Sequence, residues 1–181
     1  MTWIALRTAR RVFLSLLVCC AALPELARAD KEEVYESPAA FVANAFSGRT
    51  PAAKTVAFES DIAGKASKIM GHPYHSSRVR YWQAGSRTAW VLDEIGKTKP
   101  ITAGIVVDGG RIVSMKVLVY RESIGWEVKR PAFTGQFQGA TLNGSRLTRT
   151  VNGIHGATLS CDALRKLGAL ALLLHGAVNQ S

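Results

Sequence analysis

The sequence predicts an α+β fold: an antiparallel sheet flanked by helices, with a long helix at the C-terminal end. From residue 78 to residue 121 the apolar positions recur with a period of two, which is typical of strands. The stretch from Thr158 to Val178 is rich in leucine and is predicted to be the long helix. The chain has 181 residues, 48% hydrophobic and 20% charged, which is enough for one globular domain with a core.

The first 29 residues have the features of an export signal. An apolar stretch of about a dozen residues runs from Val12 to Leu23, and small residues occupy the positions that signal peptidase reads before a cut after Ala29. The basic start contains three arginines: Arg7, Arg10 and Arg11. We therefore expect residues 1–29 to be a signal peptide and residues 30–181 to form a single periplasmic domain. An uncleaved membrane anchor is the alternative, although the apolar run is shorter than the roughly 18 residues that span a bilayer.

The charge is basic but not concentrated. The chain has 23 basic and 13 acidic residues, a formal net charge of +10. The expected signal peptide holds four of the basic residues and one acidic residue, so 19 basic and 12 acidic residues remain, a net charge of +7. Because no long run of like charges occurs, we expect no nucleic-acid partner; an anionic ligand or a membrane surface fits better. The remaining segment contains one cysteine, Cys161, so no internal disulfide is possible there.

Two helices and a short strand are predicted before the region of alternating residues. The first helix begins at Ser37-Pro38, a hydroxyl N-cap followed by proline at the first helical position, and ends at Gly48. The second runs from Asp61 to Met70 and is stopped by Gly71-His72-Pro73. Lys54–Glu59 between them is expected to be a strand.

The alternating region is predicted to hold four strands. They are Arg78–Ala84, Arg87–Asp93, Ile101–Asp108 and Arg111–Arg121. Asp108-Gly109-Gly110 is a tight-turn signal that should join the last two as a hairpin. A short helix is expected at Pro131–Gln138, and nothing in the sequence indicates a second domain, a linker or a repeat.

The segment Asn152–Ser160 carries the strongest chemical signal. Gly153 and Gly156 allow a sharp turn and close approach of the backbone to a ligand. The loop leads into the last helix, whose unpaired amide groups and positive dipole end stabilise a bound phosphate. Thr158 places a hydroxyl group beside that position. Ordinary helix capping is the alternative interpretation of the same residues.

Gly156-Ala157-Thr158-Leu159-Ser160 resembles the (Ser/Thr)-Gly-Ala-Thr-x-(Ser/Thr) signature of the FMN-binding domain family. This family includes the C subunit of the sodium-pumping NADH:quinone reductase, the G subunit of the Rnf complex and small exported stand-alone proteins. In many members a flavin transferase moves the FMN part of FAD onto the motif threonine as a phosphoester. The resemblance implies attachment at Thr158. It also implies cofactor contacts from its neighbours: His155, Gly156, Ala157, Leu159 and Ser160.

Two upstream segments resemble further motifs in the family order. Glu122-Ser123-Ile124-Gly125-Trp126 is similar to the Glu-Thr-Pro-Gly segment near the flavin ring, and Phe133–Gly139 is similar to an aromatic-Gln-Phe-Gly stretch. The ordered set covers about residues 101–170, the core motif region. The resemblance implies contacts with the flavin from five residues: Glu122, Ser123, Gly125, Trp126 and Phe137. For Trp126, filling the interface between sheet and helix is an equal alternative to stacking on the ring.

The chain departs from the family pattern at two positions. Asn152 stands where the family usually has Asp, and His155 where it usually has Ser or Thr. Because the transferase reads this local sequence, three states stay open: FMN attached covalently to Thr158, FMN bound noncovalently, and a protein without flavin.

The resemblance implies an exported FMN flavoprotein that carries electrons and is not a stand-alone catalyst. We expect a membrane redox protein and a flavin transferase as partners, and a periplasmic location, with a peripheral position at the inner membrane as a variant. The alternatives are a noncovalent FMN- or phosphate-binding module and an unflavinylated accessory subunit of a membrane redox complex. No catalytic side chain is nominated. No metal is expected either, because His72 and His75 have no cysteine or carboxylate cluster near them in the sequence.

Overall fold

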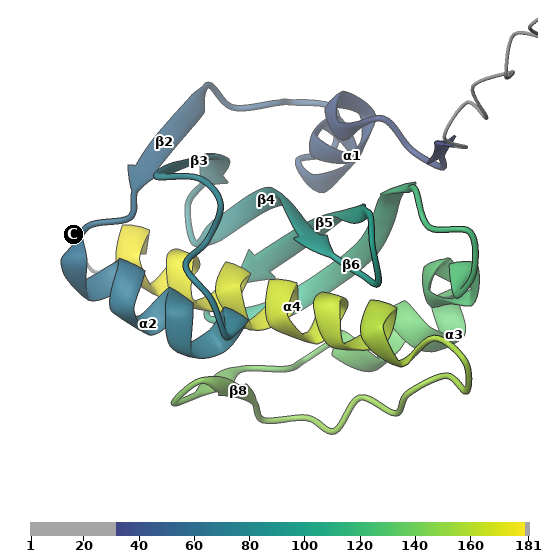
Figure 1. Ribbon diagram of the computed structural model, residues 1–181. Helices are drawn as coiled ribbons and strands as arrows, with labels where there is room; N and C mark the ends of the chain where they lie inside the picture. Colours follow the sequence, from purple (N-terminus) through teal and green to yellow (C-terminus); the bar gives the residue numbers. More distant parts are fainter. Residues whose placement is uncertain (1–31, 180–181) are drawn as a thin grey trace, which may run out of the picture.

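Alternating apolar residues build an antiparallel sheet of six strands (Figure 1). The computed structural model describes residues 32–179, so the expected signal peptide and its cleavage site lie outside the described residues. The strands stand in the order β1-β6-β5-β4-β3-β2. Their bounds are β1 (Glu33–Val34), β2 (Ala53–Ala57), β3 (Arg78–Ala84), β4 (Arg87–Ile95), β5 (Pro100–Asp108) and β6 (Arg111–Tyr120). With helices on the sheet and a long helix last, the predicted α+β class is confirmed.

The hairpins of the sheet follow the turn signals of the sequence. β4 and β5 pair along their whole lengths, from Arg87 opposite Asp108 to Ile95 opposite Pro100. The predicted hairpin between β5 and β6 is confirmed, since Gly109 has a φ of 53° and the next glycine a φ of 74°. Two successive residues with positive φ are what a tight two-residue hairpin turn requires.

The helices begin and end largely where local signals place them. α1 (Pro38–Ala45) is capped by Ser37, whose Oγ accepts a hydrogen bond of 3.1 Å from the Ala40 N–H. α2 (Ser60–Met70) ends at Gly71, and α4 (Thr158–Asn179) begins at the predicted residue. The helix expected at Pro131–Gln138 is instead α3 (Pro131–Thr134) followed by the 3₁₀ turn η2 (Gly135–Phe137).

Three small elements carry no sequence signal that we used. They are β1, the 3₁₀ turn η1 (Trp126–Lys129), and the two-stranded hairpin of β7 (Leu142–Asn143) and β8 (Arg146–Leu147). Each is only two to four residues long, which is too short to show a period.

The helices cover both faces of the sheet. α4 lies across one face with α2 beside it, and α1 packs on the other (Figure 1). Leu164, Leu167 and Leu170 of α4 are fully buried in the main core. On the α1 side, the Phe41 ring lies so close to Gly104 that a Cβ there would come within 2.7 Å of it. Within residues 32–179, no helix combines the length and apolar character needed to cross a bilayer.

Candidate functional site

The start of α4 presents an exposed hydroxyl beside unpaired amide groups. Thr158 is the first residue of the helix and is exposed, whereas Ala157 before it and Ser160 after it are buried. The first helical bond that we find here joins the Cys161 N–H to the Ala157 carbonyl, at 2.9 Å. Because helical bonds reach back one turn, the N–H groups of residues 158–160 have no partner within the helix. This geometry is suited to hold a phosphate.

Gly125 packs directly on this helix start. Its φ is +84°, and a Cβ at this position would lie 3.2 Å from the Ala157 Cβ and 3.2 Å from the Ser160 Oγ. The same Cβ would lie 2.9 Å from the Tyr120 hydroxyl oxygen. Only glycine therefore allows the loop to approach the helix so closely. The two segments that resemble flavin-binding motifs, more than thirty residues apart in the sequence, are in contact here.

Tyr120 joins the loop to the helix by hydrogen bonds. Its hydroxyl donates to the Ile124 carbonyl at 2.5 Å, and its oxygen lies 3.0 Å from the Ser160 Oγ. Since the phenol has one proton, the Ser160 hydroxyl is the donor of the second bond. Burial raises the pKa of Tyr120, which keeps the phenol protonated. Tyr120 is not among the site residues predicted from the sequence, because a tyrosine at a strand end carries no distinctive pattern.

Glu122 holds the loop between β4 and β5. Its Oε1 accepts hydrogen bonds from three successive backbone N–H groups, those of Lys97, Thr98 and Lys99, at 2.5, 2.6 and 2.9 Å. Its Oε2 accepts a bond of 3.2 Å from the Thr98 hydroxyl. Burial alone raises the pKa of Glu122, but these donors outweigh it and the pKa is lowered overall. The carboxylate is therefore an anchor for the 97–99 loop.

The two aromatic residues of the expected site lie in different environments. Trp126 is 40% exposed, and the Arg130 guanidinium carbon lies 4.8 Å from its ring centroid, within cation–π range. Phe137 is fully buried and meets Phe133 edge-on, with 5.7 Å between centroids. Its ring also lies against α4, where a Cβ on Gly168 would be 3.3 Å away. Trp126 is thus open to a ligand, whereas Phe137 occupies the core.

An apolar surface flanks the exposed threonine. Among the described residues, few large apolar side chains are exposed, and three of them belong to the two contacting segments. They are Ile124 at 54%, Trp126 at 40% and Leu159 at 52%. Ser123 is exposed beside them. Exposed apolar side chains gathered near one site are typical of a place that a ligand or partner covers.

The loop before α4 contains the two residues that depart from the family pattern. Asn152 is exposed, and its backbone N–H donates a 2.7 Å hydrogen bond to the Gln136 Oε1. His155 and Gly156 are both exposed next to Thr158. Neither departure buries or blocks the Thr158 side chain, which is itself exposed.

Two further histidines, His72 and His75, lie in the segment between α2 and β3. The His72 Nε2 is 2.9 Å from Glu94 Oε1, and the His75 ring is tilted by 44° against the Tyr74 ring, with 4.3 Å between centroids. Over residues 32–179 we find no cluster of three or more His, Cys, Asp or Glu side chains that could hold a metal ion.

The chain matches no protein-family model, and no curated protein sequence matches it.

Proposed function

We propose that this protein binds FMN at the start of α4 and serves as an electron carrier, with the flavin joined to Thr158 by a phosphoester. The observation that carries the proposal is the packing of Gly125 on Ala157 and Ser160. Two segments that resemble flavin-binding motifs meet there, and an exposed threonine stands beside them. Ordinary capping of α4 does not require an exposed apolar loop at the same position.

In the proposed attachment step, FAD donates its FMN part to the Thr158 hydroxyl group. The Thr158 oxygen forms a bond to the FMN phosphorus, the anhydride bond between the FMN and AMP halves of FAD breaks, and AMP leaves. The hydroxyl proton goes to solvent, and a flavin transferase catalyses the step. The attached phosphate then lies against the free amides of the first turn, which stabilise its charge without a basic side chain.

The surroundings fit a flat ring next to this phosphate. Ile124, Trp126 and Leu159 supply apolar surface on the two contacting segments. FMN, when bound, supplies one- and two-electron chemistry. The protein holds it, and the open surface leaves an edge of the ring within reach of a partner, which we propose to be a membrane redox protein in the periplasm.

Intact mass and visible absorbance test the proposal. Residues 30–181 are co-expressed with a flavin transferase, precipitated with acid, and compared with Thr158→Ala, Thr158→Ser and the control Thr150→Ala, an exposed threonine earlier in the same loop. We expect yellow colour in the pellet and the mass of FMN less water for the wild type, Thr158→Ser and Thr150→Ala only.

Any other result of this experiment would identify one of the alternative states of the protein. Colour released to the supernatant means noncovalent FMN, and no flavin in either fraction means an accessory protein without flavin. Covalent flavin that persists in Thr158→Ala means that the anchor is another residue.

A further inference from the structure

β6 has an incomplete outer edge. β5 pairs with it on one side, while β1 pairs on the other side only with Val119 and Tyr120. Past the end of β1, the Leu118 carbonyl accepts hydrogen bonds from the Tyr35 N–H at 2.8 Å and from the Glu36 N–H at 3.4 Å. The chain then turns away into α1.

At the other end of this edge, Ile112 of β6 is hydrogen-bonded to the segment that follows η2. The Ile112 N–H donates to the Ala140 carbonyl at 2.9 Å, and the Ile112 carbonyl accepts from the Gly139 N–H at 2.8 Å. Between Ile112 and Leu118, residues 113–117 have no backbone hydrogen-bond partner on the side away from β5 in the described part of the chain. Because N–H and C=O groups of an antiparallel strand point alternately to its two sides, this stretch presents free donors and acceptors.

A pocket of about 550 Å³ lies along this free edge. Residues 113–117 form one wall, and Tyr35 and Glu36 close one end. The other wall is formed by residues between 129 and 138, among them Lys129 of η1 and the flanking residues Arg130 and Gln138. We call this pocket the β6 slot. It lies where one further strand would extend the sheet.

The β6 slot is positively charged. The single acid in its wall, Glu36, already accepts bonds of 2.8 Å from Lys116 and 2.8 Å from Asn44. Lys129 lies over the Tyr35 ring at 3.9 Å, and Arg130 over the ring of Trp126; within residues 32–179 neither cation has a carboxylate partner. Two cations are therefore left for an incoming anionic group.

We propose that the β6 slot receives an extended acidic segment of a partner protein, which adds a strand to β6 between Tyr35 and Gly139. Main-chain hydrogen bonds to residues 113–117 supply the pairing, as in other strand-addition interfaces, and Lys129 and Arg130 select acidic side chains. This inference goes beyond the proposed electron carrier and does not depend on a bound flavin.

Charge argues against a second copy of this chain as the occupant of the β6 slot. In a second copy the same cations would face one another, which is unfavourable. Glu32 pairs with Arg121 at 2.9 Å, on the side of Tyr120 away from residues 113–117. An acidic partner segment fits both the charge and the position.

Peptide binding to the flavin-free protein tests this inference. The probe is a fluorescein-labelled octapeptide of alternating valine and glutamate, titrated by fluorescence anisotropy. We expect saturable binding that protects the amides of residues 113–117 from hydrogen exchange. Lys129→Glu combined with Arg130→Glu should weaken it about tenfold or more, because close charge pairs become repulsive. The control is Arg78→Glu combined with Arg80→Glu, two exposed arginines of β3, which should keep the affinity.

Two further peptides separate strand addition from simple charge attraction. A valine–glutamate peptide N-methylated at every residue, which has no N–H donor on either edge, and a valine–lysine peptide should not bind. The inference is overturned if the first probe does not bind, if the N-methylated peptide binds equally well, or if the control variant loses as much affinity. A concentration-dependent dimer in sedimentation that protects the same amides would assign the slot to a second copy instead. Circular dichroism checks that each variant is folded.

Discussion

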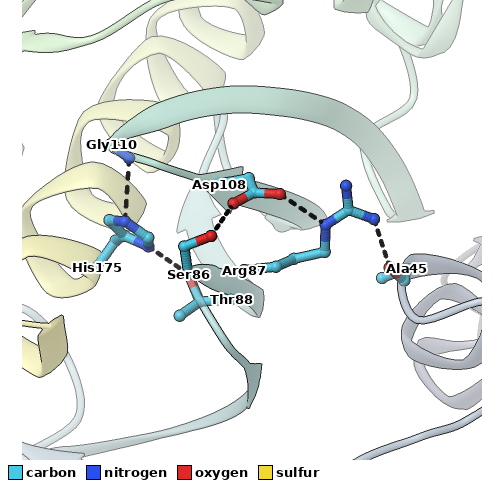
Figure 2. Close-up of polar contacts among 7 residues, drawn as sticks. All are labelled: Ala45, Ser86, Arg87, Thr88, Asp108, Gly110 and His175. Carbon is cyan, nitrogen blue, oxygen red and sulfur yellow. Dashed lines mark hydrogen bonds and ion pairs between the residues drawn. The ribbon is translucent and has the colours of Figure 1, made fainter.

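The Nδ1 atom of His175 in α4 lies 2.8 Å from the Oγ1 atom of Thr88 in β4, inside the core (Figure 2). The Nε2 atom of the same ring accepts a 3.1 Å hydrogen bond from the Gly110 N–H, so in the neutral ring the proton is on Nδ1 and is donated to Thr88. The Thr88 oxygen also accepts a bond from the Trp90 indole at 2.8 Å. The last helix is thereby tied to β4 and to the β5–β6 turn.

The first prediction concerns acid stability. Burial lowers the pKa of His175 more than the nearby Asp108 raises it. In the unfolded chain the pKa is about 6.5, so below that pH the unfolded state binds a proton that the folded state resists. We expect the contribution of His175 to the free energy of unfolding, measured with urea as the difference between wild type and His175→Leu, to be full above about pH 6.5 and to fall as the pH is lowered below it.

One variant and one control test whether His175 causes this loss of stability in acid. His175→Leu should reduce the pH dependence and cost about 1–3 kcal/mol at pH 7.5, because the Gly110 N–H loses its acceptor. His75→Gln, at an exposed histidine, is the control. An unchanged pH profile in His175→Leu would locate the sensitivity elsewhere.

The second prediction concerns His72, whose stabilising contribution is lost as the pH rises, whereas that of His175 is lost as the pH falls. His72 hydrogen-bonds through Nε2 to the buried Glu94, at 2.9 Å, and through Nδ1 to the Pro73 carbonyl, at 2.8 Å. These bonds, that to Glu94 first, raise the pKa of His72. The stabilisation is therefore full below the unfolded pKa and is lost as the pH rises through the folded pKa. We expect His72→Gln to lower the melting temperature more at pH 6 than at pH 8.5; an equal loss at both pH values would contradict the charged pair.

The third prediction concerns the contact between the two motif segments. Gly125→Ala places a Cβ 2.9 Å from the Tyr120 hydroxyl oxygen and forces a non-glycine residue to a φ of +84°. Gly71→Ala is the matched control, with a φ of +79° and nothing within 4 Å of the new Cβ. We expect a loss of about 1 kcal/mol from backbone strain in Gly71→Ala and about 2–4 kcal/mol in Gly125→Ala, since overpacking adds to the strain.

Urea denaturation measures both losses, and flavin content is measured in the same samples. Only Gly125→Ala should retain less flavin. Equal losses of stability in the two variants would mean that the loop moves freely away from α4.

The fourth prediction separates anchoring from flavin contact at Glu122. Glu122→Ala removes an acceptor from the N–H groups of residues 97–99 and should cost about 1.5–3 kcal/mol, as expected for bonds to a charged group. Hydrogen exchange at residues 97–99 should accelerate even without flavin. Glu122→Gln keeps an acceptor oxygen and should have a smaller effect. Unchanged exchange in Glu122→Ala would mean that the loop does not depend on this carboxylate.

Protonation of the Glu122 carboxylate should cause a second loss of stability, at a lower pH than that expected for His175. Because its folded pKa is below the usual 4.5, its contribution is present above that pH and is lost as the pH falls through the lowered pKa. The step is measured as the difference between wild type and Glu122→Gln below pH 4.5.

Local patterns predicted the long elements well. The bounds of β3 and the start of α4 agree with the expectation, because alternation and a glycine-rich turn before a helix are properties of neighbouring residues. The strand expected at Arg87–Asp93 is longer in the structure and reaches Ile95. Two-residue strands such as β1 were missed, since they are defined by a partner and not by a period.

The sequence by itself determined the class of fold, the hairpin turn at Gly109, the first residue of α4 and the motif residues from which FMN binding is proposed. Tertiary structure decided how those residues are used. It buried Phe137, turned the Glu122 carboxylate to the 97–99 loop and placed Tyr120 between the two motifs. Within residues 32–179 it also left residues 113–117 without a strand partner on the side of β6 away from β5. The reason is physical: backbone conformation follows from near neighbours, whereas burial, hydrogen-bond partners and free sheet edges depend on residues that only folding brings together.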